Sequence, residues 1–148
     1  MSINLNIKTV IKSSSGHIFV DTDNNILNLI ILNKEYNKEE FTSLCVCLKE
    51  FFNQAFINKK KYYLIFDVRN IGVYPLYCYE QVKKNLEELK NILPYVLHST
   101  CVLVEPNLTA HILNFFFKIY KPVRPAKIIT SLDQSMPFFN ENMNTAVY

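Results

Sequence analysis

The residues best placed for chemistry lie in the segment that follows the apolar run ending at Val68. They combine a carboxylate, a guanidinium, a carboxamide and phenol rings, and they are Asp67, Arg69, Asn70, Tyr74, Tyr77 and Tyr79. Open α/β sheets place their ligands at the carboxyl ends of strands, and Tyr and Arg are common at binding surfaces. This pattern predicts a binding loop after a central strand. The alternative is that Arg69 pairs with Asp67 or a neighbouring carboxylate while the tyrosines cover the sheet edge.

A second candidate is the aromatic segment within residues 111–120. Its members are Phe115, Phe116, Phe117, Lys118 and Tyr120. Consecutive helical positions are about 100° apart, so the phenylalanines span about 200°, wider than the roughly 100° stripe that a packed helix buries. We therefore expect an interface helix covered by a protein partner, an identical subunit, a membrane surface or an acyl ligand. The alternative is a helix wedged deep in the fold.

Catalytic motifs are missing from the sequence. Its only glycines are Gly16 and Gly72, so neither a phosphate-binding P-loop nor a dinucleotide-binding G-x-G-x-x-G can be built. His17, His98 and His111 have no carboxylate or cysteine at metal-ligand spacing. No serine or cysteine lies in a nucleophile elbow. We expect a protein that is not an enzyme and that holds neither metal nor cofactor.

Composition further limits the kinds of partner and the location to be expected. The formal net charge is only +3, and the one tight basic run, Lys59 to Lys61, is typical of a solvated loop, so we expect no nucleic-acid partner. No apolar run is long enough to span a bilayer, and the first residues do not resemble a signal peptide. The cysteines lie in apolar segments without C-x-x-C spacing, as buried free thiols do. These features favour a cytoplasmic protein. The Asn-, Ile- and Lys-rich composition suggests an AT-rich genome, such as that of a parasite or a large DNA virus.

Alternation with period two, short apolar runs and helical periodicity mark the elements that must position these residues. Strands are predicted near residues 3–12, 17–20, 26–32, 62–68, 100–104 and 126–129. Helices are predicted from the Asn37 cap to about Ile57, from Tyr79 to a stop near Pro94, from the Asn107 cap to Pro122, and after the Ser131-x-x-Gln134 capping box.

The resulting order is β-β-β-α-β-α-β-α-β-α. Strands separated by helices must pair in parallel, whereas the closely spaced first strands can form antiparallel hairpins. We therefore predict an α/β fold, a mixed sheet with about four helices, in a single domain spanning residues 1–148.

This order resembles the STAS domain and its SpoIIAA-like relatives, which are topologically related to the CRAL-TRIO (Sec14) lipid-binding lobe. Residues 64–72 (LIFDVRNIG) are similar to the family's strand, Asp and short turn, and residues 126–134 (AKIITSLDQ) to its last strand and helix start. The resemblance can be laid over nearly the whole chain. Signalling members carry a phosphorylatable Ser or Thr where the next helix starts, but residues 73–79 (VYPLYCY) contain neither.

The resemblance implies a non-enzymatic regulatory module that binds another protein or a second copy of itself. The first alternative is a small domain that binds a lipid or another hydrophobic ligand, as the Sec14-like relatives do. The second alternative is a viral assembly or structural protein.

Overall fold

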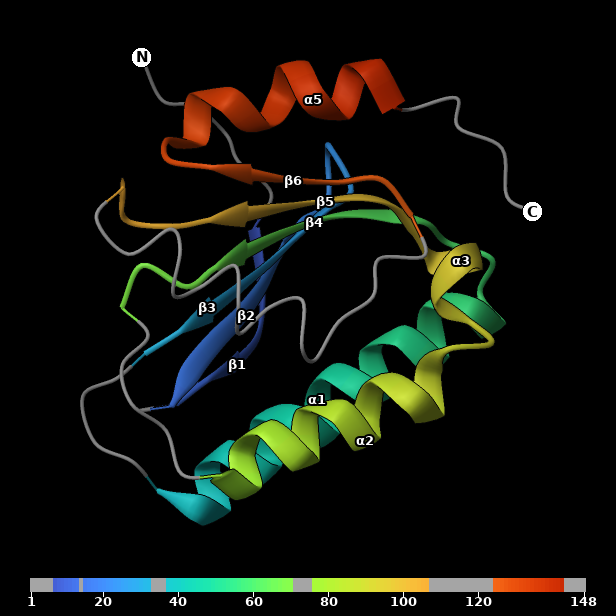
Figure 1. The fold of residues 1–148 in the computed structure, drawn as a ribbon. Helices are drawn as coiled ribbons and strands as arrows, with labels where there is room; N and C mark the ends of the chain where they lie inside the picture. The colour runs from blue at the N-terminus through green and yellow to red at the C-terminus, as the bar shows by residue number, and fades with distance from the viewer. Residues whose placement is uncertain (1–6, 14, 33–36, 71–75, 107–123, 143–148) are drawn as a thin grey trace.

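The computed structural model describes residues 7–13, 15–32, 37–70, 76–106 and 124–142, with only the backbone described for 76–79. Within these residues the chain forms a six-stranded mixed sheet in the order β1-β2-β3-β4-β5-β6 (Figure 1). The α/β class predicted from the sequence is confirmed. The strands are β1 (Ile7–Lys12), β2 (Gly16–Asp21), β3 (Ile26–Ile31), β4 (Tyr62–Asp67), β5 (Leu97–Leu103) and β6 (Ala126–Ile129).

The direction of pairing follows the lengths of the connections. β1, β2 and β3 pair antiparallel through short turns, whereas β3, β4, β5 and β6 pair in parallel. A tight turn can only reverse the chain, and a parallel neighbour needs a crossover long enough to return to the starting edge. The strands β3 to β6 therefore share one carboxyl-terminal edge.

Local capping signals set the helix limits. The helices are α1 (Lys38–Ile57), α2 (Leu76–Leu89), α3 (Leu93–Val96), the 3-10 turn η2 (Leu132–Gln134) and α5 (Ser135–Asn142). The side chain of Asn37 accepts a hydrogen bond from the backbone N–H of Glu40 at 3.1 Å, so it caps α1 as predicted. The side chain of Gln134 accepts one from the backbone N–H of Ser131 at 3.2 Å, as the predicted capping box requires.

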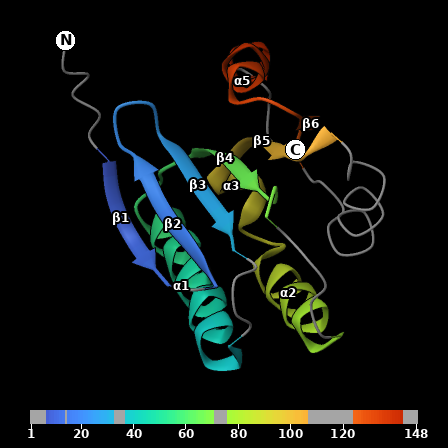
Figure 2. The same cartoon turned by 90° about the vertical axis from the view of Figure 1, so that its left-hand side faces the viewer.

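The described helices lie on both faces of the sheet, as Figures 1 and 2 show. α1, α2 and α3 lie on one face, over a large apolar core that includes Phe52 and Leu64. α5 lies on the other face, where Phe139 packs in a smaller cluster with Ile65 and Cys101. Consecutive right-handed crossovers that advance along the sheet in one direction must lie on one face, which explains why α1 and α2 are neighbours.

Several predicted boundaries were wrong. α2 begins at Leu76 rather than Tyr79. Pro94 does not stop the second helix. α2 already ends at Leu89, and Pro94 lies in the first turn of the separate helix α3, where a proline sacrifices no helical hydrogen bond. β5 begins at Leu97 rather than Thr100, because Leu97 already pairs with Tyr62 ahead of an irregularity in the register. The predicted helix after Asn107 and residues 3–6 of the first strand lie outside the described residues.

Charged side chains also connect α1 and α2. Glu88 forms an ion pair with Lys49 of α1. This pairing lowers the pKa of Glu88, mainly through the hydrogen bond from Lys49, with a smaller contribution from Lys84. The side chain of Asn85 on α2 also donates to the backbone carbonyl of Cys45 on α1 at 3.2 Å, so more than one polar contact links these two helices.

Candidate functional site

Asp67 is the last residue of β4, between Ile30 of β3 and Leu103 of β5 in the register. Its position inside the parallel part of the sheet leaves it only 5% exposed. The pleat places it on the same face as Ile65, the face that α5 covers farther along the sheet. A carboxylate buried this deeply requires partners, because an unpaired buried charge is strongly destabilising.

Arg69 supplies those partners. Its backbone N–H and its side-chain Nε donate to Oδ1 of Asp67 at 3.1 and 3.0 Å, and its Nη2 donates to Oδ2 at 2.8 Å. This forked ion pair holds both carboxylate oxygens, while 40% of the Arg69 side chain remains exposed. A guanidinium has five N–H donors, so Arg69 keeps donors for an acceptor that approaches from solvent.

Glu105 is a further charged residue of this edge, and the sequence reasoning missed it. Hydrogen bonding to Asp67 raises the pKa of Arg69, and the negative charges of Asp67 and then Glu105 add to the effect. Its position in the sequence could have revealed it. Glu105 follows β5 just as Arg69 follows β4, and parallel strands end at a common edge.

The other predicted site residues are described only in part. Asn70 is exposed beside Arg69. Tyr77 and Tyr79 lie in the first turn of α2, with their backbone alone described. Tyr74 lies outside the described residues, and so does the predicted interface helix with Phe115, Phe116, Phe117, Lys118 and Tyr120. The structure therefore brings together Asp67, Arg69 and Asn70 of the predicted loop.

The contacts of Asp67 limit the chemistry that this carboxylate can perform. The oxygens of Asp67 are already occupied by donors of Arg69, so this carboxylate is a poor general base. Among the described residues, no group of three or more His, Cys, Asp or Glu side chains could hold a metal ion. What the site offers is a guanidinium held in one orientation, with an exposed carboxamide beside it.

The structure gives a second surface feature at the β1 edge of the sheet. It is an open hollow of about 260 Å³, lined by Ile7, Thr9, Lys12, His17, Ile18 and Phe19. Ligand pockets usually measure about 300–1,000 Å³ and enclose most of a bound molecule. This hollow is too open and too small to enclose a lipid. Of the helices in the described ranges, none has the length and apolar composition needed to cross a bilayer.

Comparison of the chain with protein-family models, with curated proteins and with solved structures finds no match in any of the three.

Proposed function

We propose that the chain is a non-enzymatic regulatory module of STAS-like type, which binds another protein or a second copy of itself at the carboxyl-terminal edge of β4. The observation that carries the proposal is the exposed guanidinium of Arg69 held by the buried Asp67. Because Asp67 fixes the side chain before any partner arrives, little conformational entropy is lost on binding. Arg is among the residues that most often dominate interface energies.

The resemblance of residues 64–72 and 126–134 to STAS segments supports the same proposal. Residues 126–129 form the edge strand β6, and residues 132–142 continue into η2 and α5. The proposal does not include a phosphorylation switch, because residues 73–79 contain no Ser or Thr.

Two variants of the full chain test the proposal. Arg69→Gln keeps an amide donor for Asp67 but removes the charged fork, and Asn70→Ala leaves the ion pair intact. Lys8→Gln is the matched control, since Lys8 is an exposed cation on β1, away from this edge. We expect Arg69→Gln and Asn70→Ala to weaken self-association, measured by sedimentation velocity, or to remove particular proteins from a quantitative comparison of bound partners.

Lys8→Gln should behave as the wild type in both measurements. The proposal fails if the wild type is a monomer and its bound proteins are the same for all three variants. Reproducible turnover of a substrate that Arg69→Gln abolishes would also contradict it, because it would make the site catalytic.

A further inference from the structure

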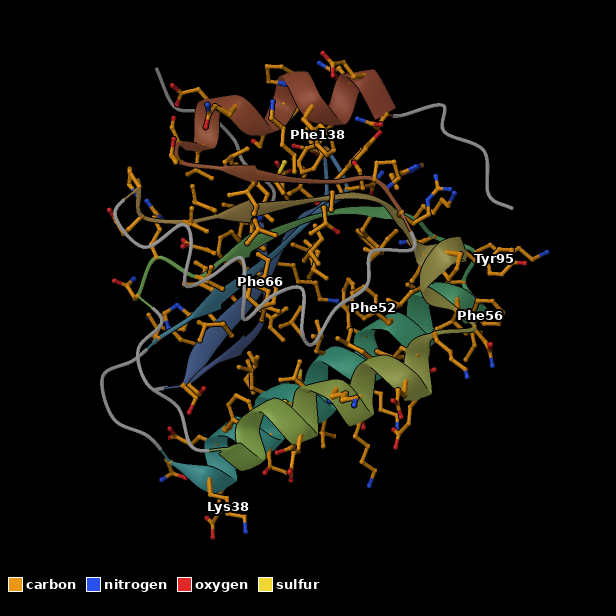
Figure 3. All side chains as sticks on the ribbon, in the orientation of Figure 1. Lys38, Phe52, Phe56, Phe66, Tyr95 and Phe138 are labelled. Atoms are coloured by element: carbon orange, nitrogen blue, oxygen red, sulfur yellow. The ribbon has the colours of Figure 1, made fainter. Side chains whose placement is uncertain are left out.

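The end of α1 presents apolar side chains to solvent. Ile57 is 67% exposed, Phe56 is 46% exposed, and Tyr95 of α3 is 56% exposed. The rings of Phe56 and Tyr95 contact each other edge to face with centroids 6.2 Å apart, and Figure 3 shows the two side chains together where α1 meets α3. Phe56, Ile57 and Tyr95 are called the apolar tip below. Single exposed apolar residues are ordinary, but here two exposed rings are in contact and Ile57 follows Phe56 directly in the chain, and exposed apolar residues that gather in this way mark contact surfaces.

Lysines follow the apolar tip directly because of the way α1 ends. The backbone N–H of Lys60 donates to the carbonyl of Ala55 at 2.9 Å, and that of Lys59 donates to the carbonyl of Phe56 at 3.2 Å. This pair of bonds is a Schellman motif, which turns the chain back at the helix end. Lys59 occupies its left-handed position with φ 54°, where glycine is the usual residue. The chain therefore keeps a positive charge at a position where the backbone favours glycine.

Further basic side chains lie at the amino-terminal edge of β4 and β5, beside Lys59 and Lys60. Burial lowers the pKa of Lys61, and the charge of Arg124 lowers it further. Burial, Lys61 and Arg124 in turn lower the pKa of His98, whose ring stacks on Tyr63 at 4.6 Å. These mutual effects on the pKa values of Lys61 and His98 indicate that Lys61, His98 and Arg124 lie near one another at this edge.

We propose that the apolar tip docks on an anionic lipid surface, with Lys59 and Lys60 facing the charged headgroups. An anionic bilayer matches both features of this surface. Its apolar layer can bury Ile57 and the rings of Phe56 and Tyr95, and its negatively charged headgroups attract the lysines. A second copy of the chain is disfavoured as the occupant, because it would bring the same lysines against these lysines. The surface lies at the edge opposite to Arg69, so this docking is additional to the interaction proposed there.

Flotation of the full chain with vesicles tests the proposal. We expect the wild type to float with phosphatidylcholine vesicles that contain about 30% phosphatidylserine, and to remain unbound with phosphatidylcholine alone or at high salt. Ile57→Ser should lower the apparent affinity about tenfold, since it removes a side chain that the bilayer would bury. Lys60→Gln should lower it about fivefold, the usual effect of one lysine near an anionic surface.

Matched controls carry the same substitutions elsewhere. Val46→Ser changes an exposed apolar residue in the middle of α1, and Lys83→Gln changes an exposed lysine on α2. Both should float as the wild type does. Lys59→Gly separates an effect on folding from an effect on binding. Glycine relieves the strain of the left-handed backbone conformation and should raise the melting temperature. Loss of the lysine charge should nevertheless weaken flotation about fivefold.

Three results would overturn the proposal. The first is a wild type that stays unbound on the anionic vesicles. The second is that Ile57→Ser, Lys59→Gly and Lys60→Gln all float as well as the wild type does. The third is a dimer in sedimentation that Ile57→Ser dissociates, which would make the apolar tip a contact between copies. Arg69→Gln should float normally, so failure of the interaction at β4 leaves this test unaffected.

Discussion

Arg69 clamps the carboxylate of Asp67 with its guanidinium and with its own backbone N–H. Since only one residue separates them, a single set of contacts shapes the turn after β4 and neutralises the buried charge. Asp67 is anchored between β3 and β5, so the orientation of Arg69 is tied to the middle of the sheet. The same contacts therefore serve stability and the proposed recognition.

The stability part can be measured with a double-mutant cycle. Asp67→Ala should destabilise the fold by about 2 kcal/mol, because the turn loses its acceptor for a backbone N–H and for the guanidinium. The coupling to Arg69→Gln should be only about 1 kcal/mol, since 40% of the Arg69 side chain faces solvent that screens the pair. Urea unfolding of both single variants and the double variant gives these values. Strict additivity would mean that the ion pair contributes nothing.

His98 should make stability depend on pH. Burial, followed by the charges of Lys61 and Arg124, lowers its pKa from 6.5 in the folded chain. As the pH falls through about 6.5, the unfolded chain binds a proton that folded His98 does not, so stability present at neutral pH is lost, by at most about 1.4 kcal/mol per pH unit. The loss levels off below the folded pKa.

His98→Phe isolates this effect, because phenylalanine does not titrate and can still stack on Tyr63. Urea unfolding at several pH values between about 7.5 and 5 should show a steeper loss for the wild type than for the variant. Parallel curves would show that His98 titrates alike in the folded and unfolded chains.

The cysteines should differ in reactivity. Cys101 is fully buried on β5, and burial raises its pKa to about 12, with only a small opposing effect of Lys127. Cys47 is only partly buried, although burial and then Glu50 raise its pKa as well. Because alkylation requires an accessible thiolate, iodoacetamide should label Cys47 well before Cys101 in the folded protein.

Peptide mass spectrometry after timed labelling gives the two rates, and labelling in urea provides the control in which both react. Equal rates for Cys47 and Cys101 without denaturant would contradict the burial of Cys101 in the cluster beneath α5.

The sequence by itself determined the features that depend on residues a few positions apart. The Asn37 cap and the helical period that follows it predicted α1 through Ile57, and the Ser131-x-x-Gln134 spacing predicted the turn before α5. Caps and periodicity act within one or two helical turns, so they can be read along the chain. The sequence also offers the pairing of Arg69 with Asp67 as one alternative, because these two residues are only two positions apart.

Packing between distant segments decided the rest. The sequence predicts a helix stop near Pro94. In the structure α2 ends at Leu89, and Pro94 lies in the separate helix α3 just before Leu97 pairs with Tyr62. The sequence also favoured a solvated loop for Lys59 to Lys61. Only the tertiary structure places Tyr95 against Phe56 beside those lysines, because burial and charge depend on which surfaces the folded chain brings together.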